Sequence, residues 1–419
     1  MNPPALLELA TELLHRVLQF KQPADAIVSD FFREHRALGQ RERHTLAETT
    51  YTVLRQRPLL LHLAQSGRGE MERRLAILGW QGNDAFLRAA LDDAEPAWLA
   101  RVAAIDRSVL PDKLRHNLPD WLAERLQAAL GDEFWPLVDS LNAPAPLDLR
   151  VNAFKAKRDE VQAAFKAEGV EALPTPYSPL GLRIQGKPAL HKLEVFLRGD
   201  VEVQDEGSQL LALMLDAKRG EMVVDFCAGA GGKTLALGAS MRNTGRLYAF
   251  DTSGHRLAAL KPRLARSGLS NVYPAQIAHE RDERIKRLAG KIDRVLVDAP
   301  CSGLGTLRRN PDLKWRQSPQ AIDEMRVKQA AILASAARLV KPGGRLVYAT
   351  CSLLDEENEA ITEAFGAASA EQFEVLPAEQ ALARAHVADA AALVRGDFLR
   401  LWPHRHGTDG FFAAVWQRR

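Results

Sequence analysis

From residue 221 onward the sequence repeats one pattern: a short apolar run, a loop and a helical stretch. This alternation predicts a doubly wound, Rossmann-like α/β domain, with a parallel sheet covered by helices on both faces. The expected strands are MVVD (222–225), RLYAFD (246–251), RVLVD (294–298) and GRLVYAT (344–350), the last preceded by a tight KPGG turn. The expected helices are 234–241, 253–267, 318–339 and 357–364.

All three cysteines of the chain come just after expected strands. Cys227 follows the first strand, Cys301 the third and Cys351 the fourth. Because loops at the carboxyl ends of parallel strands carry ligands and chemistry, we interpret these thiols as functional rather than as small core residues. The loop of Cys301 also contains Asp298 and ends in a basic arm. That arm contains Arg308, Arg309 and Lys314.

Composition restricts the class of protein only broadly. The chain has 419 residues and a net charge of +3, which fits two or three domains and does not by itself indicate a nucleic-acid partner. Cysteines this far apart do not form a disulfide framework and fit a reducing compartment. There is no long apolar run and no basic stretch of the signal-peptide type at the N-terminus. We therefore expect a cytoplasmic protein without membrane contact. We also expect a monomer, and no metal site.

The first third of the chain has helical periodicity and no strand pattern before residue 145. Helices are expected at 5–20, 26–33, 40–57, 71–90 and 119–130. A basic cluster lies in this region, formed by Arg33, His35, Arg36, Arg41, Arg43, His44, Arg55 and Arg57. Charge alone leaves two interpretations open, a solvated helix face paired with nearby glutamates or a patch that contacts phosphates.

A linker rich in proline and alanine, NAPAP (142–146), separates this region from a small α/β unit. That unit has strand-like runs at 147–151, 181–184 and 201–203, with a helix at 158–168. We therefore expect three domains. They are an all-α domain at 1–141, a small α/β domain at 142–205 and a catalytic domain at 206–419.

A glycine-rich loop, DFCAGAGGKT (225–234), follows the first strand of the catalytic domain, and Asp251 ends the second. A phosphate-binding Walker loop would need glycine at Cys227, and a dinucleotide fingerprint would need it at Thr234. An S-adenosylmethionine site needs only the glycine-rich turn and an acid for the ribose, so it fits best. Lys233 begins the next helix, where the helix dipole disfavours a cation, which supports a role facing ligand or substrate.

A methyl donor beside loop thiols suggests methylation of a poor carbon nucleophile, such as carbon 5 of a pyrimidine. A thiolate that adds to carbon 6 makes carbon 5 reactive, so that covalent catalysis divides one difficult step into easier ones. A carboxylate near ring N3 would stabilise charge as the adduct forms. A second thiol near the first could assist release of the product.

Four segments closely resemble the bacterial Sun/RsmB family of ribosomal RNA cytosine-5 methyltransferases. They are CAGAGGKT (227–234), DAPCSGLGTLRRNPDLKW (298–315), ATCSLLDEEN (349–358) and DGFF (409–412). Residues 32–55 resemble the NusB-like RNA-binding domain of this family, and residues 147–205 resemble its RNA-recognition-like insert. The resemblance thus covers nearly the whole chain and implies a small-subunit ribosomal RNA as partner.

The resemblance also implies roles for individual residues. Cys351 is expected to be the nucleophile, and Cys301 to assist release. Asp298 is expected to contact the target cytosine and to lie against the cofactor. DNA enzymes use the Pro-Cys thiol as nucleophile, so a chain with both cysteine loops resembles the RNA type. The expected contacts of S-adenosylmethionine are Cys227, Ala228, Gly229, Ala230, Gly231, Gly232, Lys233, Asp251 and Asp298.

The sequence departs from the family pattern at two places. Gly229 and Ala230 stand where the family commonly has Ala-Pro, which predicts a more flexible loop. The family's acid on the adenine side of the cofactor has three candidates here, His279, Glu280 and Asp282, and the sequence does not decide among them.

Two rival functions remain from the sequence. One is a non-enzymatic RNA-binding scaffold that uses the NusB-like part, which the thiols and the acid on strand-end loops oppose. The other is an NAD-dependent dehydrogenase on the same type of sheet, which the poor glycine fingerprint opposes.

Overall fold

The computed structural model describes all 419 residues, and they form two compact units. The first contains residues 1–144 and 306–319, and the second contains residues 145–305 and 320–419. A short segment from the second half of the chain is therefore part of the N-terminal helical unit. The expected division into three consecutive domains, at 1–141, 142–205 and 206–419, stays a prediction.

The first unit is helical throughout, and no strand precedes residue 147, as the periodicity predicted. Its helices are α1 (Pro3–Val17), α2 (Ala24–Glu34), α3 (Gln40–Arg55), α4 (Arg57–Ala64), α5 (Met71–Leu78), α6 (Asp84–Arg88), α7 (Glu95–Ala103), α8 (Asp112–Arg115), α9 (Asp120–Leu130), α10 (Phe134–Asn142) and α17 (Leu313–Arg316). None of the protein's helices combines the length and the apolar character that a membrane span requires.

The single helix expected at 71–90 is wrong, because the chain forms α5 and α6 there. Gly79 ends α5, and a side chain at that position would come within 2.5 Å of Val53. Asn83 then caps α6 by accepting a hydrogen bond from the Phe86 backbone. Gly79 and the Asn83 cap thus divide this segment into two helices, although its apolar periodicity predicted one.

The segment 306–319 packs within the helical unit, against α3. The Nζ of Lys314 donates to the carbonyl of Arg55 at 2.8 Å, and the Trp315 indole donates to the carbonyl of Leu54 at 2.8 Å. Lys314 and Arg308 are both buried. The expected basic arm is therefore corrected: two of its three cations are part of the helical core.

A small antiparallel sheet opens the second unit, with the strand order β2-β3-β1-β4. Its elements are β1 (Leu147–Val151), α11 (Arg158–Ala167), β2 (Ala172–Pro174), β3 (Gly181–Ile184), α12 (Glu194–Leu197) and β4 (Val201–Val203). The order of elements along the chain, β-α-β-β-α-β, is ferredoxin-like. The small α/β unit predicted from the sequence is thus present, with β2 as an additional short strand.

The main sheet has nine strands, in the order β11-β12-β13-β9-β8-β5-β6-β7 with β10 beside β13. The strands are β5 (Met222–Asp225), β6 (Arg246–Asp251), β7 (Val272–Gln276), β8 (Ile292–Asp298), β9 (Val340–Thr350), β10 (Phe373–Leu376), β11 (Val394–Arg395), β12 (Phe398–Leu401) and β13 (Phe411–Arg418). The helices around it are α13 (Glu206–Met214), α14 (Gly232–Ser240), α15 (Gly254–Ser267), α16 (Glu283–Lys286), α18 (Pro319–Ala337), α19 (Glu359–Ser369), α20 (Ala378–Arg384) and α21 (Pro403–His406).

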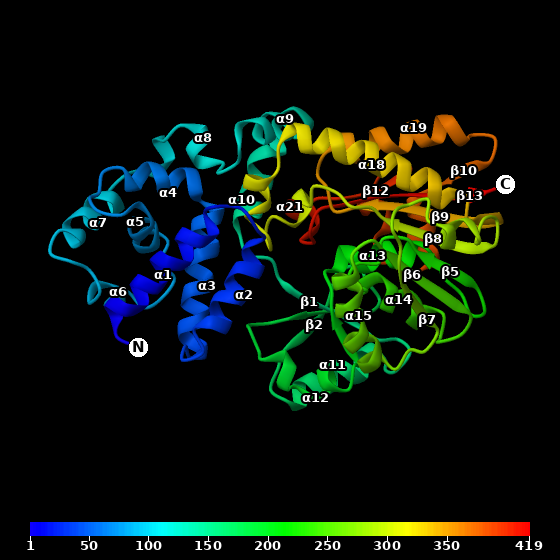
Figure 1. The fold of residues 1–419 in the computed structure, drawn as a ribbon, viewed down its shortest axis with the longest axis horizontal. Helices are drawn as coiled ribbons and strands as arrows, with labels where there is room; N and C mark the ends of the chain where they lie inside the picture. Colours follow the sequence, from blue (N-terminus) through cyan, green and yellow to red (C-terminus); the bar gives the residue numbers. More distant parts are fainter. The chain divides into compact units, whose positions relative to one another are not determined.

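Helices cover both faces of this sheet, as the alternation predicted (Figure 1). The helices α13, α14, α15 and α20 pack on one face, and α18 and α19 on the other. The sheet is not parallel throughout, which corrects the sequence expectation. The strands β7, β6, β5, β8 and β9 are parallel, whereas β10 to β13 are antiparallel. Short connections join β11, β12 and β13, and such connections favour antiparallel pairing. The KPGG residues expected as a turn lie inside β9.

The strand order reverses at β5, which has β6 on one side and β8 on the other. Ligands of open α/β sheets bind at the carboxyl ends of strands beside such a switch point. The strands β5, β6, β8 and β9 end there in Asp225, Asp251, Asp298 and Thr350. The fold therefore gathers the predicted site residues of four separate loops at one edge.

Candidate active site

The structure brings two of the three thiols together. The Sγ atoms of Cys301, after β8, and Cys351, after β9, lie 3.4 Å apart. The parallel pairing of β8 with β9 sets this distance, since Asp298 is in register with Ala349. The hydrogen bond with Cys351, together with burial, raises the pKa of the Cys301 thiol well above its usual value. Either thiol can be the donor of the hydrogen bond between the two sulfur atoms.

A buried carboxylate ties the two cysteine loops to each other. Glu357 accepts hydrogen bonds from the Ser302 amide at 2.8 Å, the Ser302 hydroxyl at 2.6 Å and the Gln329 amide at 3.0 Å. The Ser352 hydroxyl donates to the same carboxylate. Each of these serines directly follows one of the paired cysteines. Sequence reasoning missed this residue, although the repeated Cys-Ser pair and the acidic run after Cys351 could have indicated it.

The DGFF segment meets the same loops through the backbone. The Gly305 amide donates to the carbonyl of Cys351 at 2.8 Å, and the Gly410 amide donates to the carbonyl of Gly305 at 2.8 Å. A side chain on Gly305 would come within 2.1 Å of the Gly410 carbonyl oxygen. Three segments far apart in sequence are thus fixed around Cys351 by contacts that only glycine allows.

A partly buried ion pair, Lys233 with Asp298, lies at the same edge of the sheet. The Nζ of Lys233 donates to Oδ2 of Asp298 at 2.6 Å, and the ammonium lies 5.9 Å from the centre of the Phe411 ring. Burial acts to lower the pKa of Lys233, but the charges of Asp298 and Cys351 act to raise it, and the net direction is upward. Lys233 therefore stays a cation. A cation of this kind favours anionic groups nearby.

The glycine-rich loop between β5 and α14 is held by Asp251. Its Oδ2 accepts from the Gly229 amide at 2.8 Å, and its Oδ1 accepts from the Ser253 amide at 2.7 Å. Gly229 and Gly231 have φ angles of 55° and 84°, in the left-handed region that favours glycine. Asp251 thus shapes the loop as well as lying at the predicted cofactor position.

Asp225 and Cys227 begin this loop and are buried in different ways. Asp225 accepts a hydrogen bond from the Thr234 hydroxyl at 2.6 Å, and burial raises the pKa of its carboxyl to about 7. Cys227 packs against the hydrophobic cluster on one face of the sheet, and burial raises the pKa of its thiol. The interpretation of Cys227 as a reactive thiol therefore gains no support, while its backbone remains part of the loop.

The three candidates for the adenine-side acid all have local partners. Asp282 caps α16 by accepting from the amides of Ala278 and Arg284, at 3.0 and 2.9 Å. Glu280 pairs with Arg281 at 3.5 Å, and the His279 ring accepts from the Arg281 amide at 3.1 Å. The structure does not single out one of them, so the assignment stays open.

The basic cluster of the helical unit separates into structural and exposed members. Arg55 is buried and donates to the carbonyl of Arg308 at 3.2 Å. Arg57 stacks on the rings of Phe20 and Trp315, at 5.3 and 5.5 Å. Burial lowers the pKa of both guanidiniums. Both arginines pack within the helical unit, and Arg55 is not exposed to a phosphate.

The remaining arginines of the cluster lie nearer the surface. Arg43 is half-buried, donates to the carbonyl of Leu38 at 2.9 Å and stacks on a phenylalanine ring. Arg33 is exposed and pairs with Asp30. Arg36 and Arg41 are exposed at the end of α2 and the start of α3. They are the members best placed for a ligand.

The strand order, the switch point and the glycine-rich loop place the second unit among the Rossmann-like methyltransferases. Two family models match the chain: 16S rRNA methyltransferase RsmB/F at residues 212–417, and the ferredoxin-like domain of the RsmF/B-like methyltransferases at residues 118–191. The chain belongs to the RsmB/F methyltransferase family. This membership supports S-adenosylmethionine as the cofactor, and the helical N-terminal region is consistent with a NusB-like domain.

Individual relatives agree with this assignment. The chain is 37% identical over 304 residues to the probable ribosomal RNA small subunit methyltransferase B of Synechocystis, covering 72% of this chain and 66% of that relative. It is 29% identical over 414 residues to the corresponding probable enzyme of Bacillus subtilis, covering 98% and 90%. The match thus spans just under two thirds of the first relative and most of the second. The crystal structure of PH0851 aligns over 99% of both chains, with 28% identity and a TM-score of 0.81.

Proposed function

We propose that the protein transfers a methyl group from S-adenosylmethionine to carbon 5 of a cytosine in small-subunit ribosomal RNA, through a covalent adduct with Cys351. The named relatives support ribosomal RNA methylation. The assignment of cytosine as the target base and of carbon 5 as the methylated atom rests on one observation. Two thiols lie 3.4 Å apart at the edge of the sheet that also contains the partly buried Lys233–Asp298 pair, which suits a reaction that needs one thiol to attack and another to assist release.

In the first step the thiolate of Cys351 forms a bond to carbon 6, and the ring electron pair moves toward carbon 5. The Lys233 ammonium holds the Asp298 carboxylate in place through their hydrogen bond at 2.6 Å. The Asp298 carboxylate favours a proton, taken up from solvent, on ring N3, and this proton neutralises the negative charge that the attack places in the ring. S-adenosylmethionine, when bound, supplies an electrophilic methyl group for carbon 5.

In the release step a water molecule takes the proton of carbon 5 as a base, and the electron pair of that bond restores the ring double bond as the sulfur of Cys351 departs. Cys301 is protonated and within hydrogen-bond distance of that sulfur, so it can stabilise the departing thiolate. A residue that acts only at release should not be required for the attack.

The loop 227–233 and Asp251 would hold the cofactor, with Asp298 between cofactor and cytosine. A base inside a helix cannot reach strand-end loops, so the substrate is expected to be a single-stranded or loop cytosine.

Bisulfite sequencing of ribosomal RNA from a deletion strain tests the proposal. One or more small-subunit cytosines should lose methylation in the deletion strain. A plasmid with the wild-type gene should restore it, and one encoding Cys351→Ala should not. An unchanged methylation pattern in the deletion strain would contradict the proposal.

A further inference from the structure

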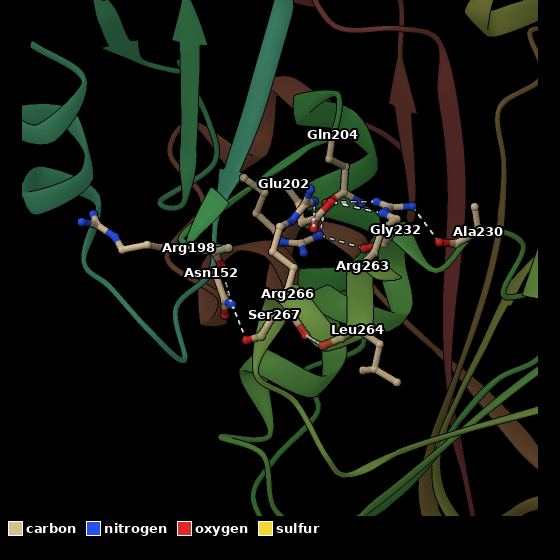
Figure 2. A network of polar contacts seen from close by, with 12 residues as sticks. Asn152, Arg198, Glu202, Gln204, Ala230, Gly232, Arg263, Leu264, Arg266 and Ser267 are labelled. Atoms are coloured by element: carbon tan, nitrogen blue, oxygen red, sulfur yellow. Dashed lines mark hydrogen bonds and ion pairs between the residues drawn. The ribbon is translucent and has the colours of Figure 1, made fainter. Parts of the chain in front are cut away.

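A network of polar contacts joins the ferredoxin-like sheet to the glycine-rich loop (Figure 2). Arg150 of β1 is buried, and its guanidinium donates to the carbonyl of Gly232 at 2.8 Å. The same guanidinium donates to Gln204, whose amide donates in turn to Ser208 at 3.2 Å. Burial lowers the pKa of Arg150 to about 10. A cation taken out of water in this way needs the loop carbonyl as a partner.

A second arginine reaches the loop from α15. The Nη1 of Arg263 donates to the carbonyl of Ala230 at 2.6 Å. Its Nε and Nη2 donate to one oxygen of Glu202, at 3.1 and 3.0 Å. Glu202 belongs to β4 of the small sheet and is buried. One guanidinium thus connects the small sheet with the loop.

The two arginines hold the carbonyl groups on either side of Gly231. That glycine has a φ angle of 84°, and Gly229 before it has one of 55°. Glycines in the left-handed region leave a loop many alternatives unless its peptide groups are fixed from outside. Asp251 fixes the amide of Gly229. Asp251, Arg263 and Arg150 together determine the orientation of the loop backbone.

We propose that Glu202 and Arg263 are positioning residues for cofactor binding, through which a strand of the ferredoxin-like sheet sets the shape of the glycine-rich loop. The inference rests on the proposed role of this loop in holding S-adenosylmethionine. A loop that is already in its binding conformation loses less conformational freedom when the ligand binds. The ferredoxin-like domain then contributes to cofactor affinity as well as to any contact with RNA.

The chain offers a matched control for this role. Arg266 lies on the same helix, pairs with the other oxygen of Glu202 and stacks on Phe196 at 4.1 Å. It therefore holds the same carboxylate and the same small domain as Arg263 does. Its guanidinium donates only to Glu202 and to no carbonyl of the loop. Loss of Arg266 removes packing between the domains but leaves the hydrogen bond to Ala230.

The test is calorimetric titration of S-adenosylmethionine into the full-length protein and three variants, with the melting temperature of each. Arg263→Met should weaken cofactor binding by about tenfold, and Glu202→Gln by a smaller factor. Arg266→Met should bind S-adenosylmethionine with an affinity within about twofold of wild type, even where its melting temperature falls as far as that of Arg263→Met. The double variant Glu202→Gln/Arg263→Met should bind no more weakly than Arg263→Met, since Glu202 acts through Arg263.

Kinetics with RNA provide a second measurement. Arg263→Met should raise the KM for S-adenosylmethionine and leave kcat at saturating cofactor and the affinity for RNA close to wild type. Equal losses of cofactor affinity in Arg263→Met and Arg266→Met would overturn the inference, and so would wild-type affinity in both. Absence of binding by the wild-type protein would instead contradict the proposed function itself.

Discussion

The sulfur atom of Cys301 lies 3.4 Å from that of Cys351, although 50 residues separate them in the chain. Two thiols at this distance cannot both carry a charge at low cost, because like charges oppose each other's ionisation. The raised pKa of Cys301 agrees with the proposed roles, in which Cys351 attacks and Cys301 assists release. This asymmetry leads to the first prediction.

Cys351→Ala should be inactive and should form no adduct, whereas Cys301→Ala should still attack and transfer the methyl group. The second variant should then accumulate a covalent protein–RNA complex, since release has lost its helper. A denaturing gel with labelled RNA and S-adenosylmethionine checks this, with Cys227→Ala as the control thiol. A stable complex for Cys351→Ala and none for Cys301→Ala would reverse the two roles.

Asp251→Ala should weaken binding of S-adenosylmethionine by about 1–3 kcal/mol, because the ribose hydroxyls and the Gly229 amide lose their acceptor. Calorimetry measures the change. Asp106→Ala is a suitable control, since Asp106 accepts a similar backbone hydrogen bond, from Ser108 at 2.9 Å, in the helical unit. Wild-type affinity in Asp251→Ala would rule out the assignment.

Arg36→Glu combined with Arg41→Glu should weaken RNA binding and make the affinity less dependent on salt, because fewer phosphate counterions are released. Arg43 is better left unchanged, since its guanidinium holds the carbonyl of Leu38. Filter binding at several salt concentrations gives both quantities. Arg88→Glu with Arg101→Glu makes the same change of charge on exposed positions of α6 and α7. Equal effects of the two pairs would favour the solvated-face interpretation of the cluster.

Glu357→Gln should strongly reduce the rate of adduct formation and lower the melting temperature only slightly. A glutamine amide would face the hydroxyls of Ser302 and Ser352 with a donor group, and leaving such buried partners unsatisfied costs about 1–3 kcal/mol. The cysteine loops would then lose their common anchor. Rates of adduct formation and melting curves should be compared with Glu363→Gln, an exposed change on α19. Wild-type adduct rates in Glu357→Gln would show that this carboxylate does not position the thiols.

The Lys314→Met variant should be more stable than the wild type, and the difference should be larger at pH 7 than at pH 10. Burial lowers the pKa of Lys314 to about 7, below its usual 10.5. Between these values the unfolded chain binds a proton that the folded protein does not, so the wild type loses stability as pH falls. Methionine has no proton to bind and removes this dependence. Melting temperatures of both proteins across this range measure the difference, and a difference that is constant with pH would contradict the prediction.

The sequence by itself determined the features that depend on neighbouring residues. Apolar runs such as RVLVD predicted the parallel strands, and their loops predicted Asp298, Cys301 and Cys351 as candidate site residues. The glycines of the loop 227–233 indicated a backbone that approaches a ligand. These signals are local because strand periodicity, glycine conformation and the position of a residue after a strand are all properties of one short segment.

Only the tertiary structure decided which of these residues meet. The register of β8 with β9 brings Cys301 to Cys351, while Cys227 is partly buried against a hydrophobic cluster of the sheet. The buried Glu357 is 55 residues from Ser302, and Arg263 is 61 residues from Glu202. The sequence also did not predict that residues 306–319 pack in the helical unit. Nor did it predict the antiparallel half of the main sheet. Pairings of this kind depend on the whole fold, since no short segment contains both partners.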